Sequence, residues 1–181
     1  RDSCSLVGSE MCIRDRVNPI YHVTGCSLRD DICPGKDYRF VRTDIRDENE
    51  VRKLFKECRP DIVINTSALS VPDYCETHHA EAEATNVTAV ETIAHVCEQY
   101  GSRFIHLSTD FVFDGKSTRL YKEEDEAIPV NYYGVTKLKA EKIIASICSN
   151  YAIVRVVVVY GKALPGQHGN ILQLVANRLR N

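Results

Sequence analysis

The chain has no excess of positive charge and no apolar run long enough to cross a bilayer. Its formal net charge is −2 with 27% charged residues, so it lacks the basic surplus that contacts to a phosphate backbone require, and nucleic acid is not the expected partner. Apolar runs such as VVVVY at 156–160 are far shorter than a membrane span, and the N-terminus lacks the apolar core of a signal peptide. We therefore expect a cytoplasmic protein that binds a small molecule and no membrane.

Closely spaced cysteine pairs are also absent. The cysteines are scattered at positions 4, 12, 26, 33, 58, 75, 97 and 148, with no Cys-x-x-Cys pair. This spacing favours buried thiols in a reducing compartment over disulfides or zinc. The histidines form no metal-binding pattern either, so we expect no metal site.

What the chain does contain is an alternation of β-rich and amphipathic helical runs. Its 181 residues, 44% of them hydrophobic, suffice for one domain with its own core. The pattern predicts strands at 38–41, 61–68, 103–109 and 151–161, helices at 75–100 and 132–148, and an exposed loop at 114–131. It also predicts a helix with an apolar face at Val51, Leu54, Phe55 and Cys58, which starts among Asp47, Glu48 and Glu50 and stops before Pro60. The last strand is almost continuously apolar, which is typical of a strand buried on both faces of a parallel sheet. The predicted fold class is α/β with a doubly wound parallel sheet.

The stretch YHVTG at 21–25 raises the question of a phosphate-binding loop, because Asp44 follows Gly25 by nineteen positions. No further glycine follows in the pattern that such a loop needs, and Pro34-Gly35 leaves no room for a helix before Tyr38. We interpret this stretch as the second strand. The first strand and its glycine-rich turn should then lie upstream, where Gly8 stands alone, so we expect an incomplete sheet that lacks its first strand.

The head of the chain suggests another origin. The stretch SLVGSEMCIRDR at 5–16 resembles the translation of a transposase-type sequencing adapter. We hypothesise that residues 1–16 are an artefactual or disordered head in place of a lost N-terminus, and that residues 17–181 form the partial domain. The alternative is a genuine but degenerate first strand, CSLVGS.

The strongest chemical signal is the pair Tyr133 and Lys137 in YYGVTK. Four residues apart on one helix, the two side chains share a face, so the ammonium can favour the phenolate form of the tyrosine. Thr109 stands at the end of a predicted strand, at the edge of a parallel sheet where ligands bind. A hydroxyl and a phenol that converge on one carbonyl oxygen would polarise it for hydride attack.

The motifs VINTSALSVPD, NVTAVETIA, IHLSTDFVFDG, YYGVTKLKAEK and VVVVYG occur in an order that resembles the extended short-chain dehydrogenases/reductases, over about residues 20–181. The resemblance is closest to the dTDP-4-dehydrorhamnose reductase branch, and it implies an NAD(P)-binding Rossmann fold. It implies that Tyr133 donates a proton, that Lys137 lowers its pKa and holds the nicotinamide ribose, and that Thr109 and Asp110 lie at the substrate. It also implies that Asn86 supports a proton-relay water; an ordinary polar residue of a helix is the alternative.

The same resemblance implies the cofactor contacts. Asp44 and Ile45 match the acid that contacts adenine and its neighbour, although a helix N-cap is an alternative role that Asp47 could fill. Residues 68–70, which are Ala68, Leu69 and Ser70, match backbone that lines the cofactor. Arg29 stands where a guanidinium could hold a 2′-phosphate, which favours NADP over NAD; a solvated surface arginine is the alternative.

Some features depart from the family. The glycine-rich turn is absent, Val157 and Val158 stand where the branch has Ser-Trp, and the chain ends at Asn181, before the expected substrate lobe. The resemblance implies an NADPH-dependent reductase of a 4-keto-6-deoxy sugar nucleotide, present here as an inactive fragment. The alternatives are a nucleotide-sugar epimerase or dehydratase, and a non-catalytic regulatory subunit similar to the methionine adenosyltransferase beta subunit. The sequence leaves open whether the chain forms a homodimer.

Overall fold

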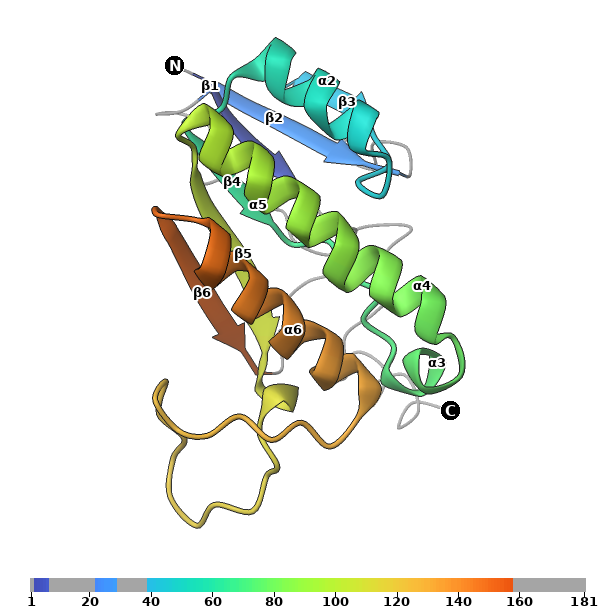
Figure 1. The fold of residues 1–181 in the computed structure, drawn as a ribbon, viewed down its shortest axis with the longest axis vertical. Coiled ribbons are helices and arrows are strands. Elements are labelled where there is room, and N and C mark those ends of the chain that lie inside the picture. The colour runs from blue at the N-terminus through green and yellow to red at the C-terminus, as the bar shows by residue number, and fades with distance from the viewer. Residues whose placement is uncertain (1, 7–21, 29–38, 158–181) are drawn as a thin grey trace, which may run out of the picture.

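The computed structural model describes residues 2–6, 22–28 and 39–157 (Figure 1). Their strands form one parallel sheet in the order β3-β2-β1-β4-β5-β6. This order reverses between β1 and β4, as in doubly wound sheets that bind dinucleotides, so the predicted fold class is confirmed. The strands are β1 (Asp2–Leu6), β2 (His22–Ser27), β3 (Arg39–Arg42), β4 (Ile62–Asn65), β5 (Arg103–Thr109) and β6 (Tyr151–Val156).

Three helices, α2 (Glu48–Cys58), α5 (Ala89–Tyr100) and α6 (Tyr132–Ile147), cover the same face of the sheet (Figure 1). Their apolar stripes pack on the strands and form the main core. Its largest fully buried apolar side chains are Phe55, Phe104, Ile93 and Ile144. Burial of each side chain contributes about 1.5–3 kcal/mol of hydrophobic stabilisation. Phe55, Ile93 and Ile144 come from α2, α5 and α6 in turn, so all three helices contribute to the core.

Helix α2 begins and ends where the sequence predicts. The side chain of Asp47 accepts hydrogen bonds from the backbone N–H groups of Asn49 and Glu50, which makes Asp47 the N-cap. Arg59 adopts a left-handed conformation with φ 44°, and Pro60 follows. The capping role thus falls to Asp47 and not to Asp44.

The prediction of one helix over 75–100 is wrong only at its start. A short helix α3 (Pro72–Thr77) ends at His78, whose φ of −126° interrupts the helix. Helix α4 (His79–Glu83) then continues through a π-helical turn, η1 (Ala84–Thr88), into α5. The helix ends at Gly101 as predicted, with φ 69°.

The expectation that the sheet lacks its first strand is wrong. Strand β1 pairs with both β2 and β4 and fills the central position. The expectation rested on the missing glycine pattern. Pairing between parallel strands uses backbone N–H and C=O groups, which any extended segment can supply. The artefactual origin of residues 1–16 therefore remains a hypothesis.

Strand β6 also differs from expectation. The apolar run predicted a strand buried on both faces, but β6 has a neighbour on one side only, among the described strands, and none of its residues is fully buried. Tyr151 and Val154 are each about two-fifths exposed. An edge position, which local hydrophobicity does not reveal, explains the difference. Residues 158–161 of the predicted strand lie outside the described residues.

Two expectations from composition can be compared with the structure. Cys26, Cys58, Cys75, Cys97 and Cys148 are buried, as predicted. Across the part of the chain that the structure describes, no helix is both long enough and apolar enough to span a bilayer.

Candidate active site

Tyr133 lies in the first turn of α6, at the end of the molecule where β5 ends (Figure 1). The helix starts there because the side chain of Asn131 accepts a hydrogen bond from the backbone N–H of Gly134 at 2.7 Å. The ring of Tyr133 is buried, with 9% exposed, and packs edge-on to Phe111 with ring centroids 6.0 Å apart. These contacts direct Tyr133 toward the segment that follows β5.

Gly134 permits this close approach. A Cβ atom added to Gly134 would lie 2.2 Å from the backbone oxygen of Phe111. The first turn of α6 and the short helix η2 (Asp110–Val112) are therefore in direct backbone contact. The sequence analysis missed this residue; the signal was a glycine between Tyr133 and Lys137, inside a helix where glycine is unfavourable.

Thr109 is the last residue of β5 and the N-cap of η2. Its hydroxyl accepts a hydrogen bond from the backbone N–H of Phe111 at 3.2 Å and donates one to Asp110 Oδ1 at 3.1 Å. Thr109 and Tyr133 are thus both in contact with the η2 turn. Asp110, the second predicted substrate residue, lies in the same turn.

Lys137 lies one turn further along α6 and is almost fully buried. Its ammonium donates to the backbone oxygen of Leu107 at 2.7 Å, and its Nζ lies 3.0 Å from Nε2 of His106. Burial lowers the pKa of Lys137 from 10.5 to about 8, while the charge of Glu141 acts in the opposite direction. The structure therefore brings Tyr133, Lys137 and Thr109 together around the C-terminal end of β5.

The buried lysine predicts a pH-dependent stability. Between pH 8 and 10.5 the unfolded chain holds the Lys137 proton and the folded chain does not, so rising pH favours the folded state. The full effect is about 3 kcal/mol. Lys137→Met removes it, so the unfolding free energy of the wild type should gain about 3 kcal/mol relative to the variant from pH 7 to pH 10.5. Urea unfolding at both pH values measures this, and an unchanged difference would contradict it.

Asn86 lies in the π-helical turn and is fully buried. Its Oδ1 accepts from the backbone N–H of Leu69 at 2.8 Å, and its amide group donates to Leu69 O at 3.1 Å and to Thr136 Oγ1 at 3.0 Å. Asn86 therefore ties the loop after β4 to α6. Both of its N–H donors are used in this bridge, and one lone pair of Oδ1 remains for a water.

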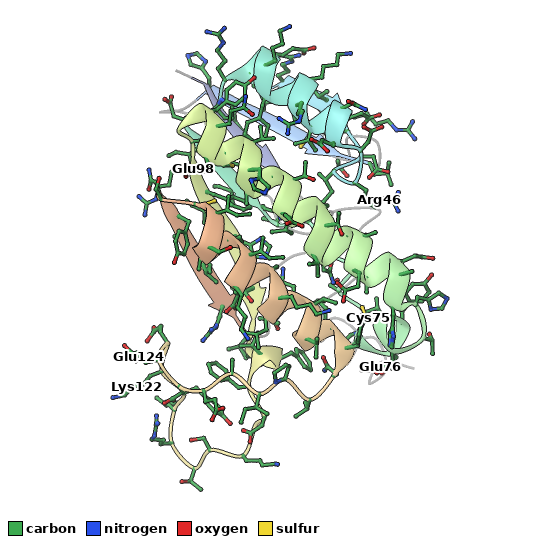
Figure 2. All side chains as sticks on the ribbon, viewed as in Figure 1. Arg46, Cys75, Glu76, Glu98, Lys122 and Glu124 are labelled. Carbon is green, nitrogen blue, oxygen red and sulfur yellow. The ribbon has the colours of Figure 1, made fainter. Side chains whose placement is uncertain are left out.

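The other predicted cofactor residues also lie past the ends of strands. Residues 68–70 form the loop after β4, with Ala68 and Leu69 partly exposed and Ser70 exposed. Cys75 of α3 donates to Leu69 O at 3.4 Å, and Figure 2 shows Cys75 and Glu76 beside the start of α6. Burial raises the pKa of the Cys75 thiol, so it is a packing residue rather than a nucleophile.

Asp44 and Ile45 follow β3 at the same edge of the sheet. The Asp44 carboxylate pairs with Arg46, at 2.9 Å from Oδ1 to Nε and 2.7 Å from Oδ2 to Nη2, and these hydrogen bonds hold the pKa of Asp44 below its usual value. The side chain of Ile45 is buried in the core. Arg29 lies outside the described residues, so its predicted contact to a 2′-phosphate remains a prediction.

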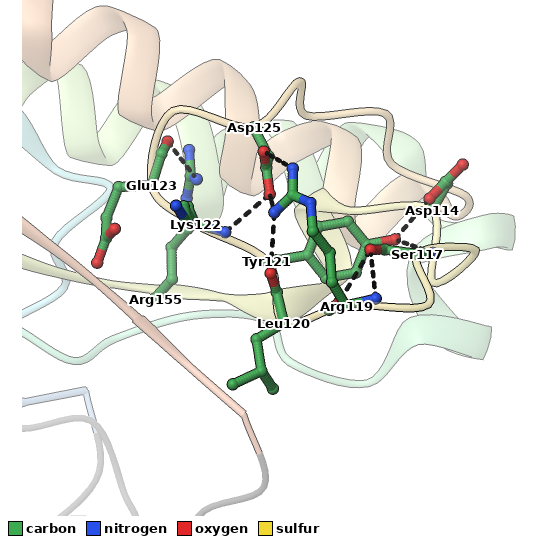
Figure 3. Close-up of polar contacts among 9 residues, drawn as sticks. All are labelled: Asp114, Ser117, Arg119, Leu120, Tyr121, Lys122, Glu123, Asp125 and Arg155. Carbon is green, nitrogen blue, oxygen red and sulfur yellow. Dashed lines mark hydrogen bonds and ion pairs between the residues drawn. The ribbon is translucent and has the colours of Figure 1, made fainter.

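The loop over 114–131 is exposed, as predicted, but it is held by its own contacts, several of which appear in Figure 3. Arg119 pairs with Asp125, and the hydroxyl of Tyr121 donates to Asp114 at 2.7 Å. Arg155 of β6 reaches the backbone oxygen of Glu123 at 3.3 Å. These contacts hold the loop beyond the ends of β5 and β6.

A partly buried ion pair that the sequence analysis missed supports this end of the sheet. Arg155 donates to both carboxylate oxygens of Glu141, at 3.0 and 2.7 Å, and Ser108 donates to the same carboxylate at 2.5 Å. Glu141 is one turn beyond Lys137 on α6. An arginine inside the apolar run of β6 was the available signal, because a charge there needs a partner.

The strand order and the cluster of polar groups at the carboxyl edge of the sheet define an α/β domain of the Rossmann type, a fold in which dinucleotides bind at this edge. Comparison with protein families then places the chain more closely. The chain belongs to the RmlD substrate binding domain family, which matches residues 7–180.

Three similar proteins illustrate the range of the family. The dTDP-4-dehydrorhamnose reductase of Escherichia coli is 36% identical over 117 residues, which cover 65% of this chain and 39% of that protein. The methionine adenosyltransferase 2 subunit beta of Bos taurus is 32% identical over 142 residues, 78% of this chain and 41% of that protein. A crystal structure of dTDP-4-dehydrorhamnose reductase from Bacillus anthracis in complex with NADP shares the fold, with a TM-score of 0.78 at 22% identity, over 98% of this chain and 59% of that one. The chain thus spans about two fifths of the length of these curated relatives.

Proposed function

We propose that the protein containing this chain is an NADP(H)-dependent reductase, able to use NAD(H) as an alternative, that moves a hydride to the 4-keto group of a deoxy-sugar nucleotide. The observation that carries the proposal is the placement of Tyr133, Lys137 and Thr109 around the end of β5. A named reductase relative at 36% identity supports the same substrate class.

The roles follow from the chemistry of the three side chains. Tyr133 donates a proton to the carbonyl oxygen as the hydride arrives, so a positive charge nearby must favour its phenolate. Lys137, one helical turn away, supplies that charge. Thr109 turns its hydroxyl from Asp110 to the substrate oxygen and helps to polarise the carbonyl.

The described residues fit a nicotinamide dinucleotide along the carboxyl edge of the sheet. Asp44 presents a carboxylate acceptor past β3, which suits the adenine amino group, and residues 68–70 present backbone past β4. Lys137 suits the nicotinamide ribose. When bound, the reduced nicotinamide supplies the hydride.

The test is a turnover assay with the full-length protein, NADPH and dTDP-4-keto-6-deoxy-mannose. We expect loss of NADPH absorbance in a one-to-one ratio with substrate. A nucleotide-sugar epimerase regenerates its cofactor, so product formation without net NADPH loss would contradict the reductase proposal. NADH in place of NADPH measures the cofactor preference.

A second candidate is a non-catalytic regulatory subunit, because the chain is 32% identical to a methionine adenosyltransferase beta subunit over 78% of its length. The two candidates differ in one measurable property. A regulatory subunit would bind a synthetase partner and show no turnover, whereas a reductase consumes NADPH with the purified protein alone.

A further inference from the structure

The structure contains a buried hydrogen-bond network, two members of which, Asn65 and His106, have no part in the proposed roles. It runs from Asn65 at the end of β4 through His106 in the middle of β5 to Lys137 on α6. Asn65 and His106 have no exposed surface, and Lys137 has 2%. Polar groups at this depth need complementary partners. In each contact of the network, one group must therefore donate and the other must accept.

Asn65 has a fixed orientation at one end of the network. The backbone N–H of Ser67 donates to Asn65 Oδ1 at 3.0 Å. Because an N–H group can donate but cannot accept, the oxygen of the Asn65 amide must face Ser67. The amide NH₂ group therefore faces Nδ1 of His106, 3.2 Å away. Nδ1 then accepts a hydrogen bond and carries no proton.

The position of the imidazole proton follows. Burial and the charge of Lys137 hold the pKa of His106 well below 6.5, so the ring is neutral and has one proton. With Nδ1 as acceptor, that proton lies on Nε2, which faces Lys137 Nζ at 3.0 Å. A neutral amine can accept this hydrogen bond, whereas an ammonium has donors only. The pair Asn65 and His106 therefore favours the deprotonated lysine.

We propose that His106, oriented by Asn65, is a positioning residue that sets the pH at which Lys137 releases its proton. The inference rests on the proposed function and deepens it. After Tyr133 gives its proton to the substrate oxygen, Lys137 passes a proton from Nζ to the phenolate, and His106 Nε2–H donates to the amine that remains. Lys137 then regains a proton from water.

The other charges around Lys137 do not replace this effect. Glu141 on the same helix favours the ammonium, but Arg155 of β6 neutralises Glu141 through two hydrogen bonds. Tyr133 lies one turn earlier on α6. Burial is the main cause of the lowered pKa of Lys137, and in the proposed arrangement the Nε2–H group of His106 adds to it.

The test is heteronuclear NMR on the full-length protein, with titration of the histidine nitrogens and of Lys137 Nζ. We expect His106 to be neutral with its proton on Nε2, and Lys137 to titrate near 8. In His106→Gln the amide oxygen can accept from the ammonium, so the pKa of Lys137 should rise by about one unit. In His106→Phe, which preserves the ring packing on Phe104 but removes the Nε2–H donor, it should also rise, by less than in His106→Gln because no acceptor replaces the imidazole.

His95→Gln on the exposed face of α5 is the matched control and should leave the titration of Lys137 unchanged. A proton on His106 Nδ1, or a His106→Gln variant that titrates like the wild type, would overturn the proposal. If His106→Gln does not fold, the tautomer of His106 in the wild type still tests the proposal. Turnover is a separate readout. In His106→Gln the alkaline limb of the reductase pH profile should shift to higher pH. Absence of turnover with the expected NMR result would overturn the reductase assignment alone.

Discussion

Tyr133→Phe is expected to lower kcat/KM for reduction of the sugar nucleotide by about 10²- to 10⁴-fold, the contribution typical of a positioned general acid. The phenyl ring preserves the edge-on contact with Phe111, so the fold and the shape of the site should persist. The variant lacks the hydroxyl that carries the transferable proton. Initial rates of NADPH consumption, with cofactor binding measured separately, check this prediction.

The neighbouring tyrosine provides the control. Tyr132 is also in the first turn of α6, but its hydroxyl donates to Glu83 at 2.8 Å, away from the end of β5. Tyr132→Phe removes one hydrogen bond, worth about 1 kcal/mol of stability, and should preserve most of the activity. Equal turnover by wild type and Tyr133→Phe would remove Tyr133 from the mechanism, whereas no turnover by either protein would favour the regulatory-subunit function.

Gly134→Ala is expected to damage both stability and activity. In an ordinary helix this change stabilises by up to about 1 kcal/mol. Here the new Cβ would lie 2.2 Å from the backbone oxygen of Phe111, so α6 or η2 must move. Overpacking of this kind costs about 1–3 kcal/mol, and a displacement of about 1 Å at Tyr133 can lower the rate about 10²-fold. Chemical denaturation and kcat measure the two effects.

Gly101→Ala separates backbone strain from steric contact. Gly101 has φ 69°, but a Cβ there meets no atom within 4 Å. The variant should lose about 1 kcal/mol of stability from the left-handed conformation and retain the kcat of the wild type. If Gly134→Ala were as active and as stable as the wild type, the close approach of α6 to η2 would not be required.

Local patterns in the sequence were sufficient for most elements of the fold. The strand predicted over 103–109 is β5, and the helix after Asp47 is α2, because hydrophobic period and capping residues act over a few positions. The pair Tyr133 and Lys137 was predictable for the same reason, since i and i+4 positions share a helix face. Their roles in chemistry remain predictions.

Features that depend on distant neighbours were not predictable. The apolar run of β6 indicated burial, but among the described strands β6 has a neighbour on one side only, and its residues are partly exposed. The π-helical turn that contains Asn86 interrupts the regular α-helical pattern, and Asn86 binds the backbone of Leu69, seventeen positions away. The residues around β6 and Asn86 do not indicate the strand order or the contact with the loop after β4.

The sequence by itself determined the alternation of strands and helices, the caps of α2 and the shared face of Tyr133 and Lys137, because these depend on backbone geometry over one or two turns. Only the tertiary structure decided that β1 fills the centre of the sheet, that Gly134 touches Phe111, and that Lys137 meets His106. The physical reason is that burial and hydrogen-bond partners belong to residues brought together by packing, and packing joins positions that the local pattern does not relate.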